Sequence, residues 1–337
     1  MILRENILLK DLTTLRAGGA ARYVVECTDE ASVREAVAFA KEKDLPFAVL
    51  GQGSNVLASD EGFPGVVLLM NIQGIETKVE GDKVTLVSGS GVSWDSLVRE
   101  AAQKNLWGIE NLAGIPGTVG AAPVQNIGAY GMEIKETLAW VEVLNTKTGN
   151  IEYIQNADCG FGYRDSRFKH EPWLVILRAA FTLSVKGEPR IGYADLARCK
   201  DEGVDLSSPL AIGEAVRTVR SKKFPDLAVE GTAGSFFKNP IVSHEKHAEL
   251  AQRYGAVPSF PVEGGIKIPL AFILDRVLGL RGHSEGKVSL FGNQPLVLVA
   301  HDSASAKEID AFAHSIAKKV FVETGIDIER EVRHFPA

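Results

Sequence analysis

Arg164 is a cation in a setting where an arginine can hold an anionic ligand. It stands within residues 161–166, Phe-Gly-Tyr-Arg-Asp-Ser, among small and aromatic neighbours. A guanidinium can grip a carboxylate through two parallel hydrogen bonds, so this residue could bind a carboxylate group. An ion pair with the adjacent Asp165 is an equally good interpretation of the sequence alone.

Ser235 is a hydroxyl within residues 234–237, Gly-Ser-Phe-Phe. It could be a nucleophile, a proton donor or a helix cap. A hydrolase nucleophile elbow needs a glycine two residues after the serine, and Phe237 stands there. The sequence therefore gives little support to a hydrolase triad.

Glu331 lies in a C-terminal segment that alternates as a strand does. Over residues 326–335 the apolar side chains Ile326, Ile328 and Val332 share one face. The opposite face carries Asp327, Glu329, Glu331 and Arg333. Charges on such a face are usually solvated, so the pattern alone assigns Glu331 no chemistry.

Two glycine-rich segments predict a ligand site. Residues 51–55, Gly-Gln-Gly-Ser-Asn, follow a predicted strand, and glycines there let backbone N–H groups approach a phosphate. Residues 114–131 contain no charged residue and many small ones, which suits backbone wrapped around a flat ring with a diphosphate tail. A tight turn and a glycine-rich crossover are the alternatives. Neither GxGxxG followed by a helix nor GxxxxGK[ST] occurs.

Two further positions have both an ordinary and a functional interpretation. Lys222 and Lys223 end a predicted helix, where cations complement the helix dipole. Tyr193 follows a glycine and could be a half-buried core tyrosine. The histidines show no metal-ligand spacing, so we expect no metal.

The elements that must position these residues alternate between short strands and helices. We expect strands over residues 23–27, 47–50, 66–70, 84–87, 140–144, 151–154 and 174–183. We expect helices over residues 29–43, 94–103 and 212–219, and a long one starting with the capping box at Ser305. Composition changes near residues 200–210 and predicts a domain boundary there.

Bulk composition excludes several classes. The chain has 337 residues with 45% hydrophobic and 24% charged residues, typical of a folded globular protein. A net charge of -6 argues against non-specific nucleic-acid binding. Three well-separated cysteines, no signal-peptide pattern and no long apolar run favour a cytoplasmic protein without disulfides or membrane insertion, and we expect a monomer.

The motifs together resemble those of the UDP-N-acetylenolpyruvoylglucosamine reductases, bacterial enzymes of peptidoglycan synthesis. The similarity runs over residues 13–335. The segments that most resemble the family's motifs are residues 50–57, 115–131, 161–166, 234–240 and 331–333. It implies an α+β fold: an FAD-binding domain of the vanillyl-alcohol-oxidase type over residues 1–204, with subdomains 1–71 and 72–204. It also implies a C-terminal α/β substrate-binding domain over residues 205–337, whose last strand returns toward the flavin.

The resemblance also implies a reaction and residue roles. FAD, bound non-covalently, and NADPH as co-substrate would reduce the enolpyruvyl group of UDP-N-acetylglucosamine enolpyruvate to UDP-N-acetylmuramate. Ser235 would donate the proton, while Arg164 and Glu331 would stabilise the intermediate.

The remaining implied residues fall into two groups. Cofactor-binding positions would be Gly51, Gly53, Ser54, Asn55, Val56, Ile115, Pro116, Gly117, Gly120, Ala121, Ala122, Asn126 and Gly128. Substrate-binding positions would be Tyr130, Tyr193, Lys223, Asn239 and Gln294, with Lys223 contacting the diphosphate and Tyr193 covering the substrate. Pro295 after Gln294 departs from the family pattern.

Two rival classes stay open. One is an oxidase or dehydrogenase of the same fold, which would often tether its flavin through a His or Cys. Neither residue occurs in the two glycine-rich segments. The other is a flavin-binding or nucleotide-binding module without catalysis, which would have no need of Arg164, Ser235 and Glu331 together.

Overall fold

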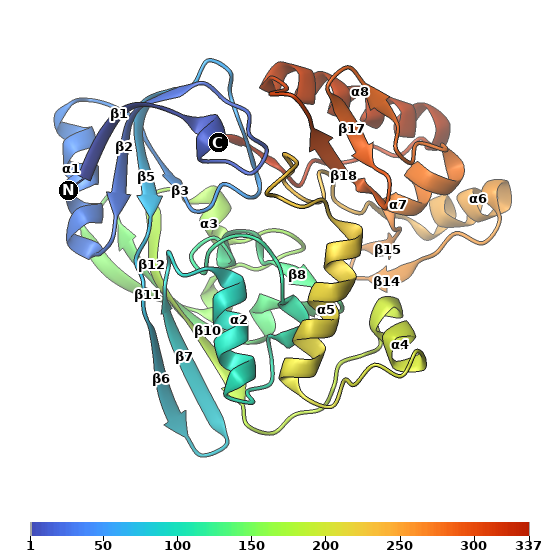
Figure 1. Ribbon diagram of the computed structural model, residues 1–337, viewed down its shortest axis with the longest axis horizontal. Coiled ribbons are helices and arrows are strands. Elements are labelled where there is room, and N and C mark those ends of the chain that lie inside the picture. Colours follow the sequence, from blue (N-terminus) through green and yellow to red (C-terminus); the bar gives the residue numbers. More distant parts are fainter. Residues whose placement is uncertain (1, 337) are drawn as a thin grey trace. The chain divides into compact units, whose positions relative to one another are not determined.

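The computed structural model describes residues 2–336, which divide into two compact units (Figure 1). Unit 1 comprises residues 2–7, Ala21–Gln52 and Phe63–Ser221. Unit 2 comprises Leu8–Ala20, Gly53–Gly62 and residues 222–336. None of the helices between residues 2 and 336 is both long and apolar enough to cross a bilayer.

This division differs from the predicted boundary at residues 204 and 205. Helix α5 (Pro209–Lys223) lies almost wholly in unit 1, because Ile212, Val216 and Val219 are buried in the core of that unit. The composition change near residues 200–210 therefore marks the connection between α4 (Ala194–Asp201) and α5.

Unit 1 contains a four-stranded sheet of order β1-β2-β5-β3, with parallel pairing of β2 and β3 to β5. Helix α1 (Glu30–Glu42) begins at Asp29, whose carboxylate accepts from the Ser32 N–H at 2.7 Å. The strands are β1 (Ile2–Leu8), β2 (Ala20–Cys27), β3 (Phe47–Leu50) and β5 (Phe63–Met70).

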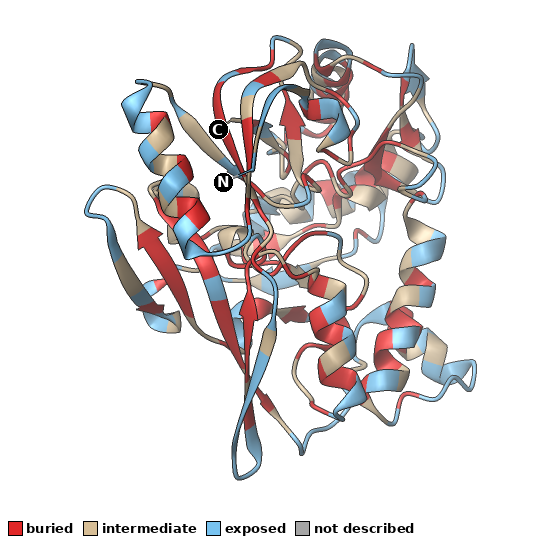
Figure 2. Cartoon of the chain, turned by 60° about the vertical axis from the view of Figure 1, so that its left-hand side comes forward, coloured by how far each residue is buried: buried red, intermediate tan, exposed pale blue. Residues whose placement is uncertain are grey.

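The second sheet of unit 1 is antiparallel, with order β11-β10-β12-β7-β6. Its β10–β11 hairpin turns over residues 145–150, as the sequence predicts. Figure 2 shows that β6 is largely exposed while β12 is largely buried. The strands are β6 (Ile75–Glu80), β7 (Lys83–Gly89), β10 (Leu138–Asn145), β11 (Asn150–Gln155) and β12 (Leu174–Ser184).

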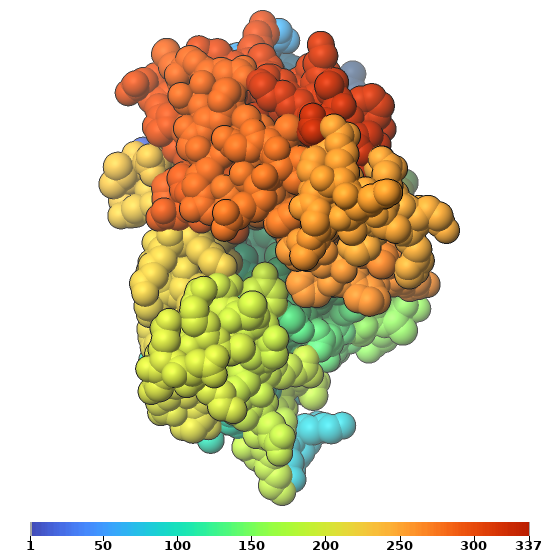
Figure 3. All heavy atoms as spheres, turned by 90° about the vertical axis from the view of Figure 1, so that its right-hand side faces the viewer, coloured from blue at the N-terminus to red at the C-terminus, as the bar shows by residue number. Residues whose placement is uncertain are grey.

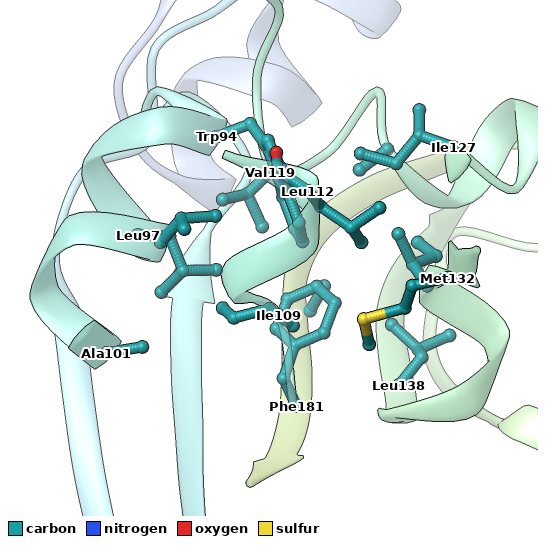
Figure 4. Close-up of a cluster of buried hydrophobic side chains, with 14 of the residues drawn as sticks. Trp94, Leu97, Ala101, Ile109, Leu112, Val119, Ile127, Met132, Leu138 and Phe181 are labelled. Carbon is teal, nitrogen blue, oxygen red and sulfur yellow. The ribbon is translucent and has the colours of Figure 1, made fainter. Parts of the chain in front are cut away.

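The core of unit 1 contains Trp94, at the start of helix α2 (Trp94–Gln103), among the buried side chains that Figure 4 shows. Trp94 is 1% exposed, and its indole N–H donates to the Leu112 carbonyl at 2.9 Å. Its ring meets Phe181 of β12 edge-on, with centroids 5.4 Å apart. Because Leu112 lies two residues before the second glycine-rich segment, this core fixes where that segment begins.

Helices α2 and α5 lie side by side in Figure 1, and ion pairs join them. Arg99 contacts Glu214 at 3.0 Å, and Arg217 contacts Asp95 at 2.9 Å. The Arg217 side chain is only 11% exposed. The pair with Asp95 is therefore screened less than a surface pair and links the two helices firmly.

Unit 2 is built from three small sheets and the helices beside them. The sheets have orders β13-β15-β14, β16-β17-β18 and β19-β4, and only the last pairs in parallel. The strands are β4 (Val56–Ala58), β13 (Ile241–Val242), β14 (Phe260–Val262), β15 (Gly265–Lys267), β16 (Ser284–Glu285), β17 (Val288–Phe291), β18 (Gln294–Ala300) and β19 (Arg333–Phe335). The helices are α6 (His244–Tyr254), α7 (Leu270–Phe272), which continues as a π-turn over Ile273–Val277, and α8 (Ala306–Thr324).

Helix α8 follows the sequence prediction closely. The Ser305 hydroxyl accepts from the Glu308 N–H at 3.2 Å, and Glu308 Oε2 accepts from the Ser305 N–H at 2.8 Å. The helix ends at Gly325, whose φ of 67° suits glycine. Its predicted stripe of Ile309, Phe312, Ile316 and Val320 is buried in the core of unit 2.

Candidate functional site

The two glycine-rich segments meet in unit 1. Gln52 Oε1 accepts a hydrogen bond from the Gly117 N–H at 3.1 Å. A Cβ added to Gly51 would lie 2.7 Å from Thr118 Oγ1, closer than side chains can pack. Glycine at position 51 is therefore required for this close approach, which joins a turn after β3 to a segment more than sixty residues later.

The second segment lies against the connection between β7 and α2. Val119 N–H donates to the Val92 carbonyl at 2.8 Å, and Gly120 N–H donates to the Ser90 carbonyl at 2.9 Å. A Cβ on Gly120 would lie 2.5 Å from the Ser90 Cβ. The Ser90 hydroxyl is buried and has no hydrogen-bond partner among residues 2–336. Ser90 is not among the predicted cofactor positions, although residues 88–91, Ser-Gly-Ser-Gly, are a third glycine-rich signal in the sequence.

Gly114 is held at both of its backbone polar groups. Its N–H donates to Asp95 Oδ1 at 2.7 Å, and its carbonyl accepts from Arg220 Nε at 2.9 Å. Burial opposes ionisation of Asp95, but the Arg217 and Gly114 hydrogen bonds hold the pKa of its carboxyl below the usual value. Helices α2 and α5 thus fix the start of the segment.

The predicted cofactor positions within the second segment differ in exposure. Pro116 and Ala121 are exposed, Ile115 is half-buried, and Ala122 is buried.

Asn126 uses its amide inside the protein. The residue is 0% exposed, and its Nδ2 donates to Glu133 Oε2 at 3.1 Å and to the Gly162 carbonyl at 3.0 Å. Its Oδ1 accepts from the Lys135 N–H at 3.2 Å. The side chain therefore ties three segments together, and a role in ligand binding would pass through its backbone or through that positioning.

Arg164 lies at the tip of a tight turn closed by reciprocal backbone hydrogen bonds of Gly162 and Asp165. Its φ of 54° is in the left-handed region, which costs energy for a residue with a Cβ. Its Nη2 donates to the Gly128 carbonyl at 2.6 Å, and a Cβ on Gly128 would lie 3.0 Å from Arg164 Nη1. The structure thus brings predicted cofactor and catalytic positions together.

Asp165 has a partner of its own. Both of its carboxylate oxygens lie 3.1 Å from His170 Nε2. Burial opposes the shift, but this hydrogen bond holds the pKa of Asp165 below its usual value. The Arg164 guanidinium donates to the Gly128 carbonyl, a partner other than the adjacent Asp165.

Tyr130 and Tyr193 meet edge to face, with ring centroids 5.2 Å apart. Tyr130 is 8% exposed and has a φ of 49° at the tip of the β8–β9 hairpin (Gly128–Ala129, Met132–Glu133). Burial raises the pKa of Tyr130 to about 12 and also raises that of Tyr193. Both hydroxyls therefore stay protonated at neutral pH, which suits hydrogen-bond donation to a ligand.

Ser235 and Glu331 lie on neighbouring segments of unit 2. Ser235 pairs with Val297 of β18 on one side. On the other side, the N–H groups of Glu331 and Val332 both point to the Phe236 carbonyl, at 2.9 and 3.4 Å. Two residues opposite one form a β-bulge, a feature that re-aims side chains beside functional sites.

The same bulge explains why the predicted C-terminal strand is shorter than expected. Regular pairing begins only at Arg333, although the predicted alternation of burial over residues 326–333 is present: Ile326 and Val332 are buried, and Asp327 and Glu329 are exposed.

The first glycine-rich segment continues from unit 1 into unit 2. Asn55 Nδ2 donates to the Glu331 carbonyl at 3.3 Å, and Arg333 N–H donates to the Asn55 carbonyl at 3.2 Å. Gly53 has a φ of 63°, and a Cβ there would lie 2.3 Å from the Leu12 carbonyl oxygen. Val56 starts β4, which pairs with β19, and Ser54 precedes it half-buried. Predicted cofactor positions 53–56 therefore lie beside the predicted catalytic acid.

Three predicted substrate positions lie elsewhere in unit 2. Asn239 Oδ1 accepts from the Leu270 N–H at 2.9 Å at the start of α7. Gln294 starts β18, and Lys223 is the last residue of α5. Within residues 2–336, no three His, Cys, Asp or Glu side chains are grouped as they would be around a metal ion.

The chain matches two protein families. Residues 21–154 match the FAD binding domain, which includes both glycine-rich segments. Residues 226–335 match the C-terminal domain of UDP-N-acetylenolpyruvoylglucosamine reductase, which includes Ser235 and Glu331. These two matches support the predicted fold class of an FAD-binding domain followed by a substrate domain.

Similar proteins cover nearly the whole chain. The UDP-N-acetylenolpyruvoylglucosamine reductase of Chromobacterium violaceum is 36% identical over 97% of this chain and 97% of its own. That of Pasteurella multocida is 38% identical over 93% of this chain and 91% of its own. The crystal structure of the Thermus caldophilus reductase aligns with a TM-score of 0.69 at 26% identity, over 99% of this chain and 100% of that one.

Proposed function

Because the chain belongs to the UDP-N-acetylenolpyruvoylglucosamine reductase family, we propose that it reduces UDP-N-acetylglucosamine enolpyruvate to UDP-N-acetylmuramate with FAD as cofactor and NADPH as electron donor. It is an FAD-domain oxidoreductase of peptidoglycan precursor synthesis. The sequence resemblance to this family is thereby confirmed.

The residues of unit 1 fit a flavin dinucleotide. A Cβ on Gly51 or Gly120 would clash with neighbouring atoms, and Gly117 has a φ of 126°, so the main chain itself forms the surface. The buried Ser90 hydroxyl beneath Gly120 adds a polar group. Backbone N–H groups and small side chains of this kind suit a diphosphate and a flat ring. We assign the cofactor to these residues and to Gly53, Ser54, Asn55 and Val56.

FAD held by these residues would supply hydride transfer between NADPH and the enolpyruvyl substrate. Hydride addition to the methylene carbon leaves negative charge on the adjacent carbon and its carboxylate. Arg164 stabilises this charge by holding the carboxylate, and Glu331 contributes as an acid. The Ser235 hydroxyl then protonates the adjacent carbon, which completes the two-electron, two-proton-equivalent reduction of the double bond.

The joining of the Ser235 and Glu331 segments at the Phe236 carbonyl is the structural observation that supports these roles, which the family match implies. A non-catalytic binding module would have no need of Arg164, Ser235 and Glu331 together. Lys223, Asn239, Gln294, Tyr130 and Tyr193 are assigned to the UDP-sugar. The cytoplasmic location and the monomeric state stay predictions from the sequence.

An absorbance spectrum of the purified protein tests the cofactor assignment. We expect a yellow protein whose FAD leaves the chain on denaturation, because the glycine-rich segments contain no His or Cys to tether it. A flavin that stays attached after denaturation would favour the oxidase class. A colourless protein that cannot be reconstituted with FAD would contradict the proposal.

A further inference from the structure

A buried amide in unit 1 joins the backbone of Tyr130 to the segment that leads to Tyr193. Asn111 is 0% exposed and lies in the 3-10 turn Glu110–Leu112. Its Nδ2 donates to the Tyr130 carbonyl at 2.9 Å and to the Arg190 carbonyl at 2.8 Å. The Asn111 amide group thus donates to the backbones of two segments that lie far apart in the sequence.

The orientation of this amide follows from chemistry. Exchanging its oxygen and nitrogen would place Oδ1 against two carbonyl oxygens, which repel it, so Nδ2 must face them. Oδ1 is then buried without a hydrogen-bond partner among residues 2–336. An unsatisfied buried acceptor is costly and needs an explanation at the position where it is kept.

Both segments that Asn111 holds need an anchor. Tyr130 adopts a φ of 49°, a strained conformation for a tyrosine that persists only when its surroundings fix it. Residues 185–193 have no regular structure between β12 and α4, and most of them are exposed. Figure 3 shows the yellow-green stretch near residue 200 on the surface of unit 1. Other anchors are Gly187 packed on Trp107 and the exposed ion pair of Arg190 with Glu136.

We propose that Asn111 is a positioning residue that holds Tyr130 and the segment carrying Tyr193 together, so that the two rings act as one substrate-binding element. This inference rests on the proposed function of those tyrosines. The rings of Tyr130 and Tyr193 meet edge to face, with centroids 5.2 Å apart. Tyr193 stands only three residues after Arg190, whose carbonyl Asn111 holds. Asn111 therefore sets the affinity for the UDP-sugar without touching it.

A double-mutant cycle between Asn111→Ala and Tyr193→Ala tests the proposal, using the full chain loaded with FAD. Asn111→Ala should raise the KM for the UDP-sugar about tenfold, the effect of losing one to two hydrogen bonds. Flavin reduction by NADPH in rapid mixing should stay within about twofold, because Asn111 acts on the substrate element only. In the Tyr193→Ala background the two-ring element no longer exists, so Asn111→Ala should raise KM by markedly less than tenfold, through its contact with Tyr130 alone.

The matched control is Glu136→Gln, which removes the charge of the exposed pair with Arg190 but keeps an oxygen that can accept from the Glu133 N–H, and it should leave KM within about twofold. Equal effects of Asn111→Ala in both backgrounds, or equal slowing of both half-reactions, would overturn the proposal. If Asn111→Ala does not fold, Asn111→Ser, which keeps one donor, enters the same cycle with the same criteria. A Tyr193→Ala variant with unchanged KM would instead overturn the assigned role of Tyr193 in the proposed function.

Discussion

The glycine-rich segments of unit 1 and the Ser235–Glu331 strands of unit 2 use the chain in opposite ways. Around Gly51 and Gly120 the main chain itself forms the proposed cofactor-binding surface. A single added Cβ there would collide with Thr118 or Ser90. Around Phe236 the main chain serves as a scaffold, and its bulge joins the segment of Glu331 to the segment of Ser235. A glycine in the first region and a polar side chain in the second are therefore indispensable for different reasons.

This difference leads to opposite consequences of substitution. Adding atoms should damage the first region, through cofactor binding and stability together. Removing one functional group should damage the second region, through turnover alone.

Glu331→Gln should give the largest effect. The amide keeps the size of the side chain but cannot give up or share a proton as an acid does, so turnover of the UDP-sugar should fall by roughly 10²–10⁴-fold. Steady-state kinetics measures this, and the thermal midpoint should stay unchanged. Glu329→Gln on the same exposed face is the matched control and should retain activity. Equal losses in both variants would show that the position of Glu331 is not special.

Gly120→Ala should lower stability by about 1–3 kcal/mol and weaken FAD binding, because the new methyl group would overlap the Ser90 Cβ at 2.5 Å. Thermal unfolding and FAD titration of the apoprotein measure the two effects. Gly292→Ala is the control, since a Cβ there meets nothing within 4 Å. Normal FAD affinity in Gly120→Ala would remove the second segment from the cofactor site.

Lys223→Ala and Tyr193→Phe should each raise the KM for the UDP-sugar, by about tenfold for the loss of a charge-assisted hydrogen bond and by less for the tyrosine. Flavin reduction by NADPH should change less. Lys222→Ala, beside Lys223 but exposed, is the control. Unchanged constants in both test variants would show that the predicted diphosphate contact and substrate cover are wrong.

The smallest effect concerns Glu285, far from the chemistry. Hydrogen bonds from Lys319 and His283 lower the pKa of its carboxyl to about 2. The pairing therefore contributes stability above the ordinary pKa of 4.5, and that contribution is lost as pH falls from about 4.5 to 2. Because the side chain is 41% exposed, the contribution should not exceed about 1 kcal/mol. Glu285→Gln should flatten acid unfolding over that range, and an unaltered curve would contradict the pairing.

Local signals in the sequence predicted local structure well. The apolar period over residues 94–103 matches the bounds of α2, and the capping box at Ser305 places the start of α8. These signals act within one or two turns of helix, so they do not depend on the rest of the fold.

Long-range pairing could not be predicted in the same way. The segment 51–56 reads as one turn, yet Gly51 belongs to unit 1 and Asn55 pairs with Arg333 in unit 2. The internal use of the Asn126 amide and the burial of Ser90 and Asn111 likewise depend on partners that no local pattern reveals. The roles of Arg164, Ser235 and Glu331 came from the family resemblance, because their residue types alone left ordinary alternatives open.

The most direct measurement is rapid mixing of the Ser235→Ala variant, with the two half-reactions followed separately by flavin absorbance. Flavin reduction by NADPH should stay near normal, because no substrate proton is needed there. Turnover with the enolpyruvyl substrate should fall by roughly 10²–10⁴-fold, as expected for a lost proton donor. Ser289→Ala, a half-buried serine of β17 bonded to His301 in the same unit, should leave both steps intact. Equal slowing of both half-reactions in Ser235→Ala, or no slowing of either, would contradict the assignment of Ser235 as the proton donor.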